Sequence, residues 1–533
     1  MRSYKRVIQG ISLALFVFLI FLLPLKIVNE TYLRLDPFSA SITALAGRYI
    51  SFEMILALFT ILATLFFGRI FCGYVCPLGV TQDLIDFFYN KRNDVYRRFV
   101  KLRYIFMAAA ATSAAFGINL GFHLLPISIA TRFYGLVVYP FIKVPVFAVM
   151  AFMQEHFGWF GYATLHIMRV SSIFAIFFII AFIFFFSRNT RRFWCKYICP
   201  SGAFMGLLSL KAPYRRRVNG DCTDCGLCDR RCPMHAVKNH KDYAVSECIS
   251  CKECVRVCPS KAVSFGFTAN GKECGFSYGQ RVLSGISRRT LLSGAVFGAS
   301  AANLSVNELA STVFNPTERG KVIYAGLIRP PAALPEKDFL ARCIRCGECV
   351  AACPTNGLQP LGLEAGSLAL FSPILVPRRG NCEATCAVCS AACPTRAIQA
   401  VDLPNKQHAK IGTARVIKER CIAWAEDKAC VVCQEVCPYN ALKLDPEAGY
   451  KSSVPKVEPN RCFGCGACEH SCPANIPAVI VEPNGELRIY TRDYITASLE
   501  AGLDLKIAEK AIVTPPVESE DYNDENSLPP GFL

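Results

Sequence analysis

The chain has 533 residues, of which 53% are hydrophobic and only 19% are charged, so it is richer in apolar side chains than a typical soluble domain. Its formal net charge of +17 could indicate nucleic acid or a membrane surface as a partner. The basic residues flank apolar stretches and no groove-reading motif is present, which disfavours nucleic acid. The 29 cysteines stand mostly in closely spaced groups, a pattern that is typical of iron–sulfur clusters and that a disulfide framework does not need.

Apolar stretches in the first 187 residues predict a membrane region. Four of them reach the ~20 residues that a helix needs to cross a bilayer, and they run over residues 7–28, 49–68, 104–128 and 168–186. A fifth stretch, 134–153, is interrupted by two prolines and a lysine and predicts a re-entrant or interfacial segment. Basic residues concentrate in segments 69–103 and 188–217. The positive-inside rule therefore places both segments, and the N-terminus, in the cytoplasm.

The two basic segments begin with nearly the same sequence, which indicates an internal repeat. Each contains Cys-x3-Cys-Pro, with Cys72 and Cys76 in the first copy and Cys195 and Cys199 in the second. Residues four apart share one face of a helix, so each copy presents two thiols together. The four thiols could bind an additional cluster, act as redox-active dithiols, or be structural.

Two cysteine quartets with the spacing Cys-x2-Cys-x2-Cys-x3-Cys-Pro follow the membrane region. In bacterial two-cluster ferredoxins, the fourth cysteine of such a motif ligates the other cluster. One cluster is therefore expected on Cys222, Cys225, Cys228 and Cys258, and its partner on Cys248, Cys251, Cys254 and Cys232. Zinc also accepts four thiolates, but a zinc site does not need two interleaved quartets. Cys274 stands alone and is expected to be a spare thiol.

A twin-arginine sequence, Ser287-Arg288-Arg289, precedes a mildly apolar run over residues 291–313. This pattern predicts a Tat-like export signal, because a domain that receives its clusters in the cytoplasm must cross the membrane folded. The alternative is a basic flank before a fifth membrane helix or a linker. Small residues around Ala301 resemble a cleavage site, but in a fused chain we expect an uncleaved anchor.

Four further cysteine motifs lie beyond residue 340, each followed by a proline. The cysteines are Cys343, Cys346, Cys349 and Cys353; Cys382, Cys386, Cys389 and Cys393; Cys421, Cys430, Cys433 and Cys437; and Cys462, Cys465, Cys468 and Cys472. We predict four more 4Fe-4S clusters, with the first motif paired with the fourth and the second with the third. Small strands and helices are expected between the motifs, for example over 478–482 and 487–490. The acidic tail, 518–533, is expected to be disordered or a docking arm.

These patterns predict an α-helical membrane domain combined with small α+β domains of the bacterial ferredoxin type. The expected divisions are a membrane domain over 1–205, a cytoplasmic two-cluster ferredoxin over 206–280, a Tat-like signal or fifth helix over 281–314, a periplasmic four-cluster domain over 315–500 and an acidic tail over 501–533. The sequence thus predicts six 4Fe-4S clusters, and a seventh if the Cys-x3-Cys-Pro pairs bind one.

On its repeated Cys-x3-Cys-Pro motifs and tandem ferredoxin, the first part resembles the NapH/MauN family of membrane ferredoxin-type proteins. From about residue 285 the chain resembles the NapG/MauM family, on the twin arginines, on Cys343-Ile-Arg-Cys346-Gly-Glu-Cys349 and on the wide Cys421–Cys430 motif. The resemblance implies a bacterial inner-membrane module that passes electrons from quinol to a periplasmic redox partner within a membrane complex. Unlike the families, this chain carries both parts in one polypeptide.

The favoured function is an electron conduit from the quinol pool to a periplasmic partner, which would make the chain a subunit of a quinol dehydrogenase. Candidate quinone-binding groups are His123, Glu155, His156 and His166, each of which could instead be a structural interface residue. Alternatives are a maturation factor that supplies electrons for metalloenzyme assembly, a conduit from a low-potential cytoplasmic donor, and a redox-sensing regulator. No flavin, haem or nicotinamide motif is visible in the sequence.

Overall fold

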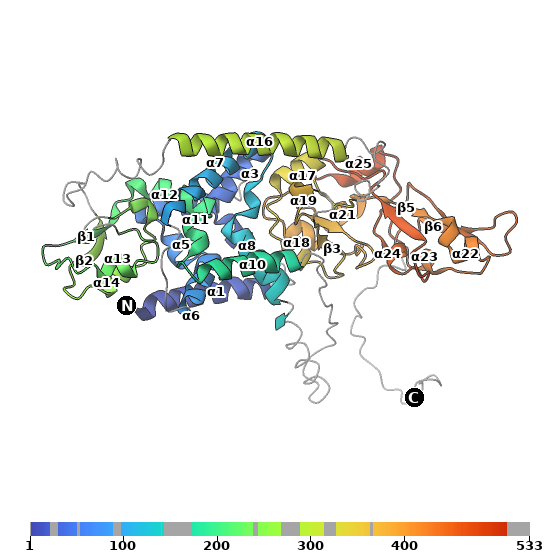
Figure 1. Ribbon diagram of the computed structural model, residues 1–533. Coiled ribbons are helices and arrows are strands. Elements are labelled where there is room, and N and C mark those ends of the chain that lie inside the picture. Colours follow the sequence, from blue (N-terminus) through green and yellow to red (C-terminus); the bar gives the residue numbers. More distant parts are fainter. Residues whose placement is uncertain are drawn as a thin grey trace, which may run out of the picture.

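The computed structural model describes residues 2–21, 30–50, 54–88, 97–139, 141–142, 173–237, 243–267, 288–313, 327–362 and 366–508. Figure 1 shows three parts in a row. A small part around strands β1 and β2 lies at one end, a bundle of helices lies in the middle, and a second cysteine-rich part lies at the other end.

The middle part consists of short helices from the first 208 residues. Their bounds are α1 Arg2–Phe21, α2 Glu30–Arg34, α3 Pro37–Gly47, α4 Ile55–Phe67, α5 Ile70–Tyr74, α6 Pro77–Phe88, α7 Leu102–Ala115, α8 Pro126–Arg132, α10 Ile173–Ser187, α11 Phe193–Tyr197 and α12 Pro200–Leu208. Short 3-10 turns and a π-helical segment, Phe133–Val138, accompany them. Within the described ranges, no helix is both long enough and apolar enough to cross a membrane.

The prediction of one unbroken helix over 104–128 is wrong. Helix α7 ends at Ala115, shortly before Gly117, which has a φ of 81°. Pro126 then begins α8, because proline cannot continue a helix but is well suited to the first position of a new one. The helix predicted over 49–68 is also shorter, since α4 begins at Ile55. The spans predicted over 7–28 and 168–186, and the interrupted stretch 134–153, extend beyond the described residues.

Helix α16 (Arg288–Val313) lies along α7. Two glycines allow the close approach. A Cβ atom at Gly294 would stand 2.6 Å from the carbonyl oxygen of Ile105, and one at Gly298 would stand 2.1 Å from the Thr112 hydroxyl. A larger side chain at either glycine would force the two helices apart. The twin arginines form the first turn of α16, and Ser287 lies outside the described residues.

Strands β1 (Tyr214–Val218) and β2 (Val263–Phe267) form an antiparallel pair that encloses the first two quartets in the sequence. Helices α13 (Leu227–Arg231) and α14 (Glu253–Arg256) lie between the two strands in the sequence and pack against each other. One ladder of backbone hydrogen bonds thereby closes a unit with two cysteine motifs.

The second cysteine-rich part repeats this design with short elements. Its strands are β3 Leu358–Pro360, β4 Pro373–Leu375, β5 Thr413–Val416, β6 Leu442–Asp445, β7 Val454–Val457 and β8 Val479–Glu482. They pair antiparallel as β3–β4, β5–β8 and β6–β7. The helices are α17 Glu336–Arg342, α18 Glu348–Ala351, α19 Gly366–Ala369, α20 Val388–Ala391, α21 Leu403–His408, α22 Ile422–Ala425, α23 Val432–Glu435, α24 Ala467–His470 and α25 Tyr494–Glu500.

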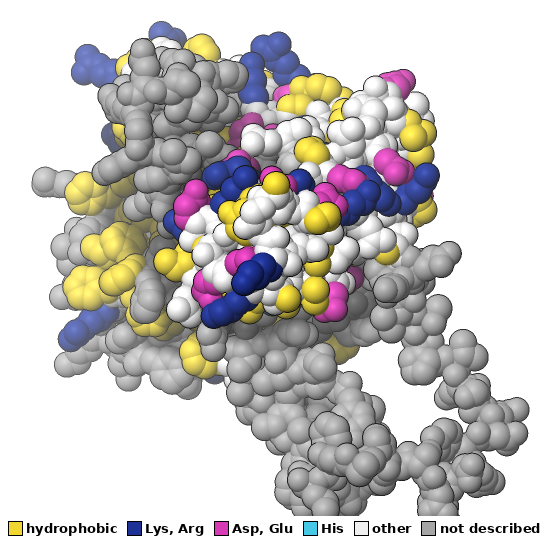
Figure 2. All heavy atoms as spheres, turned by 90° about the vertical axis from the view of Figure 1, so that its right-hand side faces the viewer, with side chains coloured by type: hydrophobic (Ala, Val, Ile, Leu, Met, Phe, Trp, Pro, Cys, Tyr) yellow, Lys and Arg dark blue, Asp and Glu magenta, His cyan; other side chains and the backbone are white. Residues whose placement is uncertain are grey.

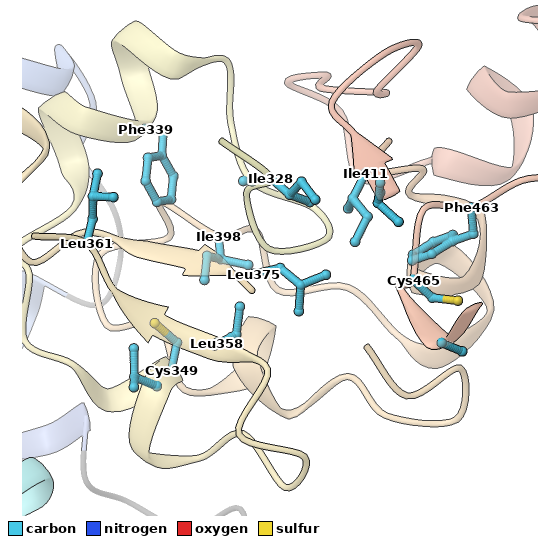
Figure 3. Close-up of a cluster of buried hydrophobic side chains, with 14 of the residues drawn as sticks. Ile328, Phe339, Cys349, Leu358, Leu361, Leu375, Ile398, Ile411, Phe463 and Cys465 are labelled. Carbon is cyan, nitrogen blue, oxygen red and sulfur yellow. The ribbon is translucent and has the colours of Figure 1, made fainter. Parts of the chain in front are cut away.

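One apolar core runs through this part. Figure 3 shows Phe339 and Ile398 on the side of the first two motifs, and Ile411 and Phe463 on the side of the last two. Of the two small elements predicted, the one over 478–482 is present as strand β8 (Val479–Glu482), but 487–490 forms neither a strand nor a helix. There the Leu487 N–H donates to the Lys410 carbonyl instead of entering a ladder. Figure 2, which views this end of the molecule, shows acidic and basic side chains interspersed on the surface.

Candidate iron–sulfur sites

The close Cys-x2-Cys-x2-Cys motifs share one backbone turn. Two left-handed residues lie between the cysteines of each motif, with positive φ at Asp224 and Gly226, Ser250 and Lys252, Arg345 and Gly347, and Gly464 and Gly466. Glycine adopts this conformation freely, whereas other residues require support from their surroundings. The turn wraps three thiols around one point, as a cubane cluster requires.

Backbone N–H groups donate to several of the thiols. Ala236 donates to Cys232, Ala414 to Cys462, Ala441 to Cys437 and Ala478 to Cys472, each with an N···S distance of 3.3 Å. Such bonds favour the thiolate over the thiol and help to set the reduction potential of a bound cluster. The donor set of four thiols with N–H···S support therefore fits 4Fe-4S clusters.

In the first unit, the structure brings together four thiols that we predicted as one quartet. One cavity is lined by Cys232 with Cys248, Cys251 and Cys254, so the fourth cysteine of one motif joins the first three of the other. In the complementary quartet, burial is the main reason that the pKa of Cys228 is raised, and the Cys222 thiol contributes to the rise.

In the second part, our predicted pairing of motifs is wrong, because the third motif pairs with the fourth. One cavity is lined by Cys437 with Cys462, Cys465 and Cys468. Another cavity is lined by Cys472 with the first three cysteines of the third motif, Cys421, Cys430 and Cys433. The strand before the third motif, β5, pairs with the strand after the fourth, β8, so that this ladder closes the two motifs into one unit.

The first motif accordingly pairs with the second. Burial raises the pKa of Cys349, and the thiols of Cys346, Cys343 and Cys393 raise it further. Burial likewise raises the pKa of Cys389, to which the thiols of Cys382, Cys353 and Cys386 add. A backbone bridge between Ala333 and Ile398 spans the two motifs. Consecutive motifs thus pair throughout the chain, as they do in the first unit.

The two Cys-x3-Cys-Pro pairs also come together. Burial raises the pKa of Cys199 well above its usual value, and the thiols of Cys195, Cys72 and Cys76 raise it further. The structure therefore brings the four cysteines of the repeat to one place. Among the described residues, no group of three or more His, Cys, Asp or Glu side chains is placed to hold a single metal ion.

The candidate quinone-binding groups are placed only in part. His123 lies at the junction of the helical bundle with the second cysteine-rich part, with its ring centroid 6.4 Å from that of Phe371. Glu155, His156 and His166 lie outside the described residues, as does Cys274.

Sequence reasoning missed two buried arginines beside the first motif of the second part. Arg132 and Arg345 are 2% exposed each. Burial and the charge of Arg345 lower the pKa of Arg132 to about 10, although the Cys346 thiol opposes this, so Arg132 remains charged near neutral pH. Neither guanidinium forms an ion pair with a carboxylate within the described part of the chain. The position of Arg345 inside the motif was the only sequence signal for them.

Thiol quartets held in consecutive pairs by short strands define an iron–sulfur protein of the ferredoxin type with several clusters. Family models agree with this class. A "4Fe-4S binding domain" matches residues 52–93 and 172–219, "4Fe-4S dicluster domain" models match 215–263 and 428–476, and a further "4Fe-4S binding domain" matches 339–359.

Curated relatives identify the family. The methylamine utilization ferredoxin-type protein MauM of Methylorubrum extorquens is 38% identical over 204 residues, which are 37% of this chain and 89% of the relative. The ferredoxin-type protein NapG of Escherichia coli is 33% identical over 29% of this chain and 70% of NapG. The putative electron transport protein YccM of Escherichia coli is 31% identical over 34% of this chain and 45% of YccM. No solved structure matches the chain. The chain therefore belongs to the MauM/NapG family of ferredoxin-type proteins, and its function is iron–sulfur electron transfer.

Proposed function

We propose that the chain is a membrane-anchored polyferredoxin that relays electrons from the quinol pool to a periplasmic redox partner through six 4Fe-4S clusters. In this proposal the helical bundle and α16 form the membrane anchor, as in the NapH/MauN-type proteins that the first part resembles. The first ferredoxin unit is cytoplasmic, and the four-cluster part lies on the periplasmic side. The chain works as the electron-transfer subunit of a membrane complex.

The observation that carries the proposal is the arrangement in Figure 1, in which the helical bundle lies between the two cysteine-rich parts. The bundle contacts the second part directly. Arg345 donates to the Asn119 carbonyl at 3.4 Å, and its guanidinium lies 4.6 Å from the centre of the Phe122 ring. Clusters on both sides of an anchor are what electron transfer across a membrane requires.

Contacts of the sites in the second part indicate their order from the bundle outwards. The quartet with Cys343 lies nearest the bundle, because the Cys346 side chain belongs to an apolar cluster that includes Tyr104 and Phe122. The next quartet contains Cys382, whose N–H donates to the Cys465 carbonyl at 2.8 Å. That contact joins the two units. The quartet with Cys421 then lies at the far end, beside α22 (Figure 1).

Anaerobic addition of a menaquinol analogue to the purified full chain in nanodiscs tests the proposal. We expect rapid reduction of the clusters, which EPR and visible absorbance spectra would detect. A full chain that dithionite reduces but quinol does not would refute the quinol-linked function and favour a low-potential cytoplasmic donor. Accessibility of α25 to a protease added to spheroplasts tests the topology. A protected α25 in spheroplasts would refute the periplasmic placement.

A further inference from the structure

The four cysteines of the internal repeat form a buried site within the helical bundle. Cys76, Cys195 and Cys199 are between 4% and 6% exposed, and Cys72 is partly buried. Burial raises the pKa of Cys76 well above its usual value, and the thiols of Cys195 and Cys72 raise it further. Cys76 and Cys199 also belong to one cluster of buried side chains, and Cys72 and Cys195 pack together in another, so the two copies meet at this site.

The two copies support the site in the same way. Cys76 and Cys199 each stand directly before a helix that begins with proline, α6 and α12. The Gly202 N–H donates to Cys199 Sγ at 3.2 Å, and the Gly79 N–H is hydrogen-bonded to Cys76. Helix N-termini and backbone donors stabilise thiolates, which are the form that ligates iron.

One arginine from each copy reaches into the other copy. Arg192 Nη1 donates to the Cys72 carbonyl at 2.9 Å. Arg69 of the first copy lies close to Gly202 of the second. A Cβ atom at Gly202 would stand 2.7 Å from Arg69 Nη2 and 3.4 Å from Cys199 Sγ.

Arg69 is fully buried, and its Nε and Nη2 atoms have no hydrogen-bond partner among the described residues. An unpartnered buried guanidinium beside four thiols is costly unless the site carries negative charge. A thiolate-ligated cluster supplies that charge.

The site adjoins the first ferredoxin unit. Cys195 forms one apolar cluster with Met234 and Ile249, against which Cys72, Cys232 and Cys251 also pack. A Cβ atom at Gly73 would stand 2.5 Å from the Ile249 carbonyl, so the backbones of the two parts touch. Thiols of the repeat and thiols of the site at Cys232, Cys248, Cys251 and Cys254 therefore pack against the same buried side chains, Met234 and Ile249.

We propose that Cys72, Cys76, Cys195 and Cys199 hold a seventh iron–sulfur cluster, which exchanges electrons with the cluster at Cys232, Cys248, Cys251 and Cys254. This rests on the proposed function insofar as the ferredoxin sites carry clusters. The step moves a single electron: one cluster is oxidised as its neighbour is reduced, and no bond or proton is transferred. The positive charges of Arg69 and Arg192 offset the negative charge of the reduced cluster.

Iron and sulfide analysis of the anaerobically purified full chain tests this inference. Wild type should contain about four more iron atoms per chain than six clusters supply. Cys199→Ala and Cys72→Ala, one from each copy, should each lose that excess and keep the rest. Cys274→Ala, which removes a cysteine outside all quartets, should keep it. Spin coupling between the seventh cluster and its neighbour should broaden the EPR signal of the reduced wild type and disappear in Cys199→Ala.

Wild type with iron for six clusters only would overturn the inference. So would mass spectrometry that finds Cys72, Cys76, Cys195 and Cys199 as disulfides in that protein. Both results concern wild type, so misfolding of a variant does not affect them. They would not contradict the proposed electron transfer through six clusters. Conversely, a failure of quinol to reduce the protein would not contradict the proposal of a seventh cluster.

Discussion

Replacing Arg132 with Met should lower the reduction potential of the cluster at Cys343, Cys346, Cys349 and Cys393. The Arg132 guanidinium is buried, interacts with the Cys346 thiol and has no partner for Nη1 or Nη2 among the described residues. Its single hydrogen bond there runs from Nε to the Ser128 carbonyl at 3.0 Å, and its guanidinium lies 4.6 Å from the centre of the Phe371 ring, so Met removes the charge and keeps an apolar side chain against that ring. Reduction adds a negative charge to the cluster, and a nearby positive charge favours it.

The expected size follows from Coulomb's law. At an effective dielectric constant of about 20, Coulomb's law gives ~2 kcal/mol for a unit charge at a separation of roughly 8 Å, which we take as the change in the free energy of one-electron reduction. That corresponds to a potential roughly 90 mV lower. Arg345→Met should shift the potential in the same direction, although its lost hydrogen bonds to the Cys343 and Leu368 carbonyls should also reduce stability.

A potentiometric titration followed by EPR measures the shift. Arg378→Met is the matched control, because Arg378 is 54% exposed and lies 3.5 Å from Glu469, so water and an opposite charge screen it. We expect the control to leave all potentials within about 20 mV of wild type. If Arg132→Met behaves like this control, the electrostatic reasoning is wrong.

Three further predictions concern pairing and stability. Cys393→Ser should abolish the cluster at Cys343, Cys346 and Cys349 and not the cluster at the other cysteines of its own motif. Mössbauer spectra of selectively reduced protein would distinguish the two clusters. Lys410→Met should lower the denaturation midpoint by the equivalent of ~3 kcal/mol, because Nζ donates to the Pro459 and Cys462 carbonyls at 2.6 Å each; an unchanged midpoint would contradict this. Burial alone would raise the pKa of Glu336, but two arginines lower it to about 2. Glu336→Gln should therefore cost ~3 kcal/mol above pH 5, and the difference should shrink as pH falls from about 4.5 towards 2; a difference that persists in acid would count against the ion pairs.

Much of the cluster chemistry could be predicted from the sequence, because spacing and backbone geometry are coupled there. A Cys-x2-Cys-x2-Cys motif wraps a cubane only with left-handed residues between the cysteines. Gly347 and Gly466 supply that conformation at no steric cost. The pairing of the last four motifs could not be derived from spacing, since it depends on which distant strands form ladders. The β5–β8 pairing decides it, and neither four-residue strand has a distinctive pattern.

The helical bundle was harder to predict because hydropathy does not report where a helix stops. The stretch 104–128 contains no Asp, Glu, Lys or Arg, yet Gly117 and Pro126 divide it. Buried arginines were equally invisible, since their stabilising partners come from remote segments. Arg192, for example, binds Asp83 with N···O distances of 2.6 and 2.7 Å across 109 positions of sequence.

Interleaved ligation also restricts how the four sites of the second part can be arranged. In each unit of two motifs, the fourth cysteine of one motif belongs to the site formed by the other motif. This arrangement fixes the distance between the two sites within one small fold. The only remaining freedom is how the units join, and the Cys382–Cys465 backbone contact fixes that step. At the same junction, Nζ of Lys406 in α21 lies 5.2 Å from the centre of the Phe463 ring, so side chains of the two units pack against each other there. The quartet with Cys421 lies beside α22, at the end of this part that is away from the bundle (Figure 1). An electron leaving for a partner should do so beside Cys430, whose neighbour Val431 is 43% exposed.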